Sequence, residues 1–169
     1  MYFSFTDDND LWEARFAALK LLAGSRVDVG LTSSASGRSR FLMAIHENGC
    51  PVMRIPARPV IEPALRSEEA KAPMRDAAME ALSAAMDGDT SAVSSALENV
   101  GKAGVEAIRR YIDGGVPPPN SPVTVSGGWV YNRVAKKGVP VSGKGFNLPL
   151  VASGALRDDF DYDVVSSGS

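Results

Sequence analysis

The sequence contains a single cysteine, Cys50, and a single histidine, His46. One cysteine excludes a disulfide within the chain and any thiolate zinc cluster. The lack of a second histidine excludes most constellations found in hydrolases and metal enzymes. No apolar run approaches the ~20 residues that a membrane-spanning helix requires, and residues 1–10 lack the basic and apolar regions of a secretory signal. We therefore expect an intracellular protein that has no cofactor and does not enter a membrane.

A surplus of basic residues is absent as well, since 18 lysines and arginines stand against 20 aspartates and glutamates. Proteins that hold nucleic acid neutralise its phosphates and usually carry such a surplus. We therefore expect no specific binding of DNA or RNA, although the balance suits a passage that conducts DNA without holding it. What the chain does have is 169 residues, 44 % of them apolar, which is enough for one domain with an apolar core.

Apolar residues recur at helical spacing in three parts of the chain. The predicted helices cover about residues 11–23, 59–86 (starting at Pro59 or Pro63) and 91–113. Asp10 and Glu13 form an Asp-x-x-Glu capping box before the first helix, and Pro73 is expected to kink or split the second. The third helix has the clearest limits, because an N-cap precedes it and two glycines and three prolines follow it.

Alternation of apolar and polar residues predicts β structure on both sides of the long helices. The alternating segments are residues 27–31, 123–125, 129–131 and 160–164. Composition predicts flexible loops near residues 32–40 and 136–147, and residues 166–169 are expected to form a disordered tail. The apolar run 41–45 fits either a helix or a strand. The order of elements predicts one α+β domain over residues 1–165, a small and mostly antiparallel sheet with an N-terminal helix and two long central helices packed on it.

Four local features have a chemical interpretation, and each has a simpler structural one. His46 and Glu47 resemble an acid–base pair, but neighbours on a strand point to opposite faces, so a turn or packing role is favoured. Cys50 fits a small buried apolar residue better than a nucleophile. Lys144 lies between two glycines but lacks the Ser/Thr and the following helix of a phosphate-binding loop. The acidic segment 158–163 lacks a glycine-punctuated calcium loop and favours a solvated or subunit-facing edge.

Two separated stretches, with a shorter one between them, resemble a known family. They are His46-Glu47-Asn48-Gly49 with Ile55-Pro56-Ala57-Arg58-Pro59-Val60-Ile61-Glu62-Pro63-Ala64-Leu65, then Asn120-Ser121-Pro122-Val123-Thr124, then Leu148-Pro149-Leu150 onward to Val164. In this order they are similar to the signatures of phage tail-completion or neck proteins, the family of the HK97-type gene-product-10 proteins and the Mu-type virion morphogenesis proteins. The resemblance covers about residues 27–165, and residues 125–147 are longer and richer in glycine than the family pattern.

The resemblance implies a structural virion protein and not an enzyme, assembled in the host cytoplasm and located at the head–tail junction. It implies a closed ring, expected to be a hexamer, that contacts portal or adaptor proteins and tail-tube or tail-terminator proteins while genomic DNA passes through its lumen. A tail terminator or head-closure connector is the nearest alternative, and a non-viral interaction module or a small hydrolase is the alternative of another class.

Arg58 lies close to two prolines, Pro56 and Pro59, where a guanidinium can bridge carboxylates or carbonyls at a subunit contact. The residues expected at subunit or partner contacts are Arg58, Lys136, Lys137, Lys144, Arg157, Asp159, Asp161 and Asp163.

Overall fold

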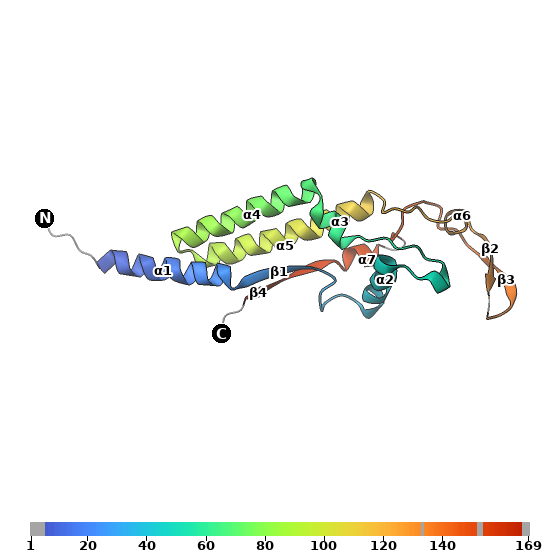
Figure 1. The fold of residues 1–169 in the computed structure, drawn as a ribbon, viewed down its shortest axis with the longest axis horizontal. Coiled ribbons are helices and arrows are strands. Elements are labelled where there is room, and N and C mark those ends of the chain that lie inside the picture. Colours follow the sequence, from blue (N-terminus) through green and yellow to red (C-terminus); the bar gives the residue numbers. More distant parts are fainter. Residues whose placement is uncertain (1–5, 133, 152–153, 167–169) are drawn as a thin grey trace.

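The computed structural model describes residues 6–132, 134–151 and 154–166. Over these residues the molecule is elongated, with a helical body at one end and a β-hairpin projecting at the other (Figure 1). Most of the expected disordered tail lies outside the described residues, and Ser166 itself ends a strand. No described helix combines the length and apolar character needed to cross a membrane.

Seven helices and four strands make up the described chain. The helices are α1 (Thr6–Ala23), α2 (Gly37–Asn48), α3 (Ile61–Arg66), α4 (Glu68–Asp87), α5 (Thr90–Asp113), α6 (Pro122–Ser126) and α7 (Ala155–Asp158), with one 3-10 turn (Pro51–Met53). The strands are β1 (Ser25–Gly30), β2 (Gly128–Asn132), β3 (Lys137–Val141) and β4 (Asp161–Ser166). This confirms the expected α+β class with long central helices. The strands are divided between two antiparallel sheets of two strands each, β1–β4 and β2–β3.

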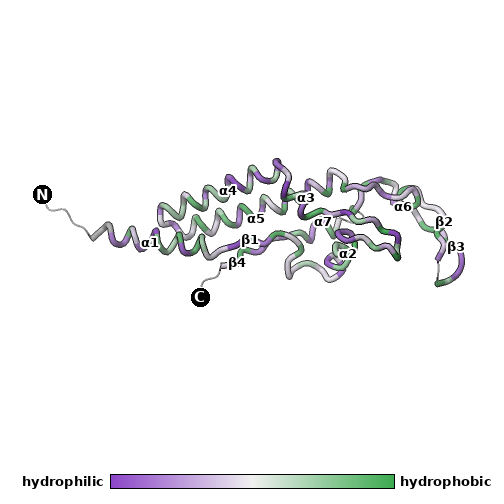
Figure 2. Tube along the Cα trace, viewed as in Figure 1, coloured by the Kyte–Doolittle hydropathy of each residue, from purple (hydrophilic) through white to green (hydrophobic). Residues whose placement is uncertain are grey.

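The long helices α4 and α5 pack side by side, and α5 also packs against both strands of the β1–β4 sheet (Figure 1). Along both helices hydrophobic and hydrophilic residues alternate, as expected of helices with one buried side (Figure 2). The buried side of α4 is made of alanines, namely Ala70, Ala77, Ala81 and Ala85. On α5, Gly101 lies against the ring of Tyr162 and Gly104 against Val29. Small residues therefore allow both α4 and the sheet to approach α5 closely.

Two apolar clusters form the core of the body. The first joins α5 to α2, α3 and the segment before β4, and its largest fully buried side chains are Phe160, Ile108 and Ile112. The second joins α1, α4 and α5 around Ala18 and Val93. Neither cluster includes a residue of the β2–β3 hairpin.

The first two predicted helices need correction at their starts and breaks. The first helix begins at Thr6, so Asp10 and Glu13 lie inside α1 and do not cap it. Residues 6–10 contain neither proline nor glycine, and the helix continues through them. The second breaks at Ser67, which has extended backbone geometry and whose hydroxyl accepts the N–H of Ala70 as the N-cap of α4. Pro73 lies within α4 without splitting it.

Several short elements also differ from expectation. The predicted loop 32–40 ends early, because α2 starts at Gly37 after the N-cap Ser36, and the ambiguous run 41–45 is part of this helix. Residues 123–125 belong to helix α6 and not to a strand, since Ser121 caps this helix through the N–H of Thr124. The predicted loop 136–147 contains strand β3. The expected strands at residues 27–31, 129–131 and 160–164 are confirmed within one or two residues.

Candidate functional site

Arg58 fastens the extended segment before α3 to the proline-rich segment after α5. Its side chain is almost fully buried, and the residue is only 5 % exposed. The guanidinium donates from Nε to the carbonyl of Pro118 (2.8 Å) and from Nη2 to the carbonyl of Pro119 (3.1 Å). Arg58 therefore bridges two carbonyls, as its chemistry suggested, but both belong to its own chain. Its expected role at a subunit contact stays a prediction that this geometry does not favour.

Glu47 fixes the same segment through the backbone of that segment. Its Oε1 accepts the backbone N–H of Val60 (2.9 Å) and of Ile61 (3.1 Å). These N–H groups lie at the start of α3, which has no side-chain cap of its own, so Glu47 acts as its cap. The strand geometry assumed for His46 and Glu47 was wrong, because both lie on helix α2. Cys50 is partly buried and pairs through its backbone with Ile55.

A cavity of about 660 Å³ lies beside α2 and the loops that follow α5. Its lining brings together residues from all three stretches that carry the family resemblance, including His46, Asn120, Thr124 and Leu150. No carboxylate lines it, while Arg38 and Lys144 do. Segments that are far apart in the sequence therefore build one structural unit.

Lys144 is held inside this unit. Its ammonium group donates to the carbonyls of Leu148 (2.6 Å) and Val151 (2.7 Å) and lies 4.9 Å from the centre of the Phe146 ring. Burial and, to a smaller extent, the charge of Arg58 lower the pKa of Lys144. Burial, followed by the charges of Arg58 and Lys144, also lowers the pKa of His46, which favours the neutral imidazole. Lys144 thus closes a loop of its own chain.

The acidic segment 158–163 has two different roles. Asp159 accepts the N–H of Ser36 (3.2 Å), and hydrogen bonds from Ser39 and Ser36 hold the pKa of its carboxyl below the usual range. Asp159 therefore fixes the start of α2. Asp161 and Asp163, by contrast, are exposed on β4. Among the described residues, neither of these two aspartates forms an ion pair.

Arg157 lies just before β4 and is also used within the chain. Its Nε and Nη2 each donate to a carboxylate oxygen of Asp113 at 2.7 Å, a bidentate pair that ties α7 to the end of α5. Sequence reasoning missed the part played by Asp113, although an acidic residue at the end of α5 opposes the helix dipole and so suggests a basic partner.

The β2–β3 hairpin, here called the arm, projects at the end of the molecule opposite to the start of α1 (Figure 1). Its base is fixed to α6, because the N–H groups of residues 144 and 145 donate to carbonyls of residues 124 and 125. Nine of its ten strand residues are exposed, and Val139 is the exception. Trp129 and Tyr131 are 74 % and 64 % exposed. Lys136 and Lys137 lie at the turn and form no ion pair with a described residue.

Two helices of the body also expose apolar side chains. On α1 the regularly spaced Trp12, Phe16 and Leu19 face solvent, and Phe16 is 72 % exposed, whereas Ala18 on another side of the helix is fully buried. The sequence pattern predicts one apolar face made of Trp12, Phe16, Leu19 and Leu22. Of these, Leu22 packs against the core, whereas the other three face solvent. On α4 the exposed apolar residues are Met79, Leu82 and Met86.

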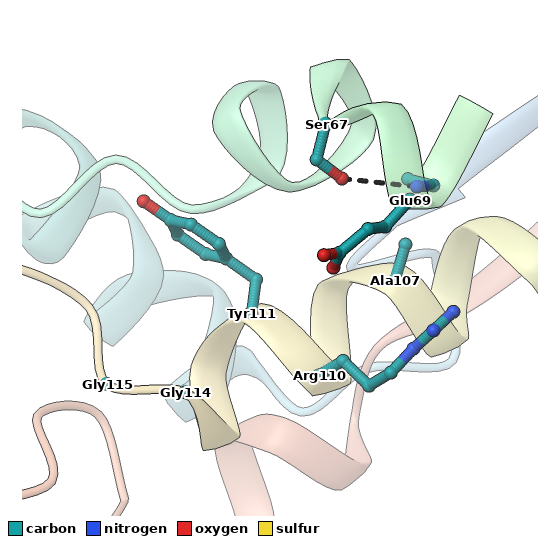
Figure 3. Close-up of a pocket in the computed structure, with 8 residues that line it drawn as sticks. Ser67, Glu69, Ala107, Arg110, Tyr111, Gly114 and Gly115 are labelled. Carbon is teal, nitrogen blue, oxygen red and sulfur yellow. Dashed lines mark hydrogen bonds between the residues drawn. The ribbon is translucent and has the colours of Figure 1, made fainter. Parts of the chain in front are cut away.

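A further pocket, of about 260 Å³, lies where the start of α4 meets the end of α5 (Figure 3). Tyr111 and Glu69 border it, and Ser67 lies at its rim. The hydroxyl of Ser67 donates to the carbonyl of Ala64 (2.9 Å) and accepts the N–H of Ala70 (3.2 Å), so both of its functions are already engaged. Within the described ranges, no three His, Cys, Asp or Glu side chains group closely enough to hold a metal ion.

The residues expected at contacts with other subunits thus divide into two groups. Those engaged within their own chain are Arg58, Lys144, Arg157 and Asp159. Those exposed at the surface are Lys136, Lys137, Asp161 and Asp163. The chain matches no protein-family model, no curated protein and no solved structure.

Proposed function

We propose that this chain is a structural subunit of a closed ring, a hexamer, in the neck of a tailed bacteriophage, and that it is not an enzyme. The observation that carries the proposal is the amount of exposed surface. The accessible surface is 11127 Å², whereas a compact monomer of 17.8 kDa exposes about 8000 Å². An elongated subunit with this surplus suits a protein that neighbouring subunits complete.

The distribution of the apolar surface supports the same conclusion. Large apolar side chains are exposed on α1, on α4 and on the arm. Soluble monomers rarely leave extended apolar patches uncovered. A subunit of a closed ring needs two different surfaces, one for each neighbour, and a subunit at a junction needs further surfaces for the layers above and below.

The family resemblance supports a location of the ring at the head–tail junction of the virion. The stretches that carry the resemblance converge on one cavity, and the engaged residues Glu47 and Arg58 hold segments of the chain together. These architectural roles suit a virion protein of the head–tail junction that is assembled in the host cytoplasm. Its partners would be portal or adaptor proteins on one side and tail-tube or tail-terminator proteins on the other, with genomic DNA passing through the ring.

The proposal is tested with a nonsense codon in the gene, in the phage that encodes it. Electron microscopy of the lysate should show DNA-filled heads separate from finished tails, and a plasmid copy of the gene should restore joined particles. Tails of uncontrolled length would favour a tail terminator instead. Intact, infectious virions without the protein would refute the neck assignment.

A further inference from the structure

We infer that the ring is closed by a specific contact, in which the arm of one copy lies on the outer face of the β1–β4 sheet of the next. This inference rests on the ring of the proposed function and adds the two surfaces that build it. The outer sheet face consists of Arg26, Asp28 and Gly30 of β1 and their partners Asp161, Asp163 and Val165 of β4.

The arm itself requires a partner. A two-stranded hairpin in water is at best marginally stable unless a face of it is packed against something. In this arm both faces are exposed, and Trp129, Tyr131 and Pro140 share one of them by strand alternation and register. Large aromatic residues of this kind form the centres of protein interfaces. Burial of the Trp129 face would stabilise the hairpin and the contact together.

The outer sheet face is the matching uncovered surface of the body. The inner face of the β1–β4 sheet, with Val29 and Tyr162, packs on α5. On the outer face Arg26, Asp28, Asp161, Asp163 and Val165 are exposed, whereas Gly30 at one end of the face is buried. Val165 is 40 % exposed. Two sheets with uncovered faces pack well against each other at a separation of about 10 Å. Contact between the arm and this face would cover both.

The charges of the two surfaces are complementary. Residues 114–156 contain no aspartate or glutamate, so all 20 acidic residues of the chain lie outside the segment that holds the arm. On the outer sheet face, Arg26 is already paired with Asp28 at 3.1 Å. Asp161 accepts hydrogen bonds from the hydroxyl of Ser34 and the N–H of Tyr162. Neither Asp161 nor Asp163 forms an ion pair with a described residue, so both can meet Lys136 and Lys137 of a neighbour, beside a groove that Asp163 and Arg40 line. Opposite charges at a contact favour this partner and register.

The contact joins two copies, because the arm projects away from the sheet of its own chain (Figure 1). Each copy offers one arm and one outer sheet face, which are different surfaces. Such a head-to-tail contact repeats around an axis and closes a ring when the rotation permits.

The test uses full-length chains with reversed charges and measures their mass by light scattering after size-exclusion chromatography. In one variant Lys136→Glu and Lys137→Glu make the arm acidic, and in the other Asp161→Lys and Asp163→Lys make the sheet face basic. Each variant alone then brings like charges together. We expect each to require about tenfold or more higher concentration than the wild type for assembly.

A one-to-one mixture of the two variants should restore the ring. In the mixture the acidic arm meets the basic face, and the unchanged basic arm meets the unchanged acidic face, so copies alternate. The matched control Lys71→Glu with Lys102→Glu changes the net charge as much as the arm variant does, on exposed helix positions, and should assemble as the wild type does. Thermal unfolding of every variant checks that the fold is kept.

Three results would overturn the inference: a wild-type chain that stays monomeric, variants that assemble normally, or a mixture that fails to assemble. Normal assembly of the variants would leave the neck proposal standing and require another ring contact. Conversely, a phage that makes normal virions without this protein would refute the neck proposal, while restoration in the mixture would still establish the contact.

Discussion

At Gly101 the absence of a side chain lets strand β4 of the β1–β4 sheet lie close to helix α5. A methyl group at this position would overlap the ring of Tyr162, which lies directly on α5. Alanine has the better intrinsic helix propensity by about 1 kcal/mol, but steric overlap in a packed interior costs about 1–3 kcal/mol. We therefore expect Gly101→Ala to lower the free energy of unfolding in urea. Gly37→Ala, where no atom lies within 4 Å of the added carbon, is the control and should not destabilise. A stabilised Gly101→Ala variant would mean that β4 does not rest on this part of α5.

The carboxylate of Asp159 holds the start of α2 in place, and its contribution to stability depends on pH. Hydrogen bonds from Ser39 and Ser36 lower the pKa of its carboxyl in the folded state. Its contribution to stability is therefore complete above the unfolded pKa of about 4 and is lost as the pH falls through the lower folded value. We expect Asp159→Asn to be less stable than the wild type at pH 7, with the difference shrinking as the pH is lowered below about 4. Chemical denaturation across this range measures it. Asp163→Asn, at an exposed position, should follow the wild type, and a constant difference for Asp159→Asn would contradict this account.

At the scale of elements, the arm is separable from the body, because none of its residues belongs to either apolar cluster. Gly128 and Val141 face each other at its base, so Asn-Gly in place of residues 129–140 would form a two-residue hairpin loop. We expect this variant to unfold within about 2 °C of the wild type and to remain monomeric. Circular dichroism and light scattering measure the two quantities. A loss of thermal stability like that of a core substitution would show that the arm supports the body.

Long elements with clear ends were predictable from the sequence, whereas short ones were not. The predicted limits of helix α5 agree with the structure because its apolar residues lie on one face, Asp89 caps its start, and glycines follow its last residue. The start of α2 and the whole of α6 were missed because these helices begin after the N-cap residues Ser36 and Ser121. Serine is a common loop residue, and its capping role appears only when the next N–H groups turn towards it. The apolar face of α1 was recognised, but its exposure depends on the position of α4.

For the candidate contact residues, too, the sequence predicted only part of what the structure shows. Composition identified a basic segment and an acidic strand, and four of the eight residues do lie exposed on them. It did not distinguish these from Lys144, whose ammonium group turns back to carbonyls four and seven residues later. Nor did it reveal that Arg157 meets Asp113, 44 residues away. Contacts of this length depend on the tertiary path of the chain and leave no local pattern.

At the scale of the whole molecule, separated surfaces of opposite charge make the proposed ring sensitive to ionic strength. The Debye length falls from about 10 Å at 0.1 M salt to about 3 Å at 1 M. We expect sedimentation analysis to show smaller assemblies at 1 M sodium chloride than at 0.1 M, with unfolding temperature nearly unchanged because the body is held by apolar clusters. Larger assemblies at high salt would indicate that apolar faces such as those on α1 and α4, and not charges, close the ring.

The pairing of β1 with β4 also determines the order in which parts of the chain can fold during synthesis on the ribosome. Strand β4 follows β1 by about 130 residues, which at typical rates of synthesis is a delay on the order of 10 s. The α4–α5 hairpin between them makes local contacts and can form within microseconds of its emergence. During the delay β1 has no strand partner, and it would be open to pairing with the same strand of a neighbouring nascent chain on the polysome. Because one face of β1 is polar through Arg26 and Asp28, such a pair would bury apolar side chains on the other face only, and a two-stranded pair of this kind is marginally stable in water. The same polar face that we place at the ring contact therefore limits the stability of this side reaction of the unfinished protein.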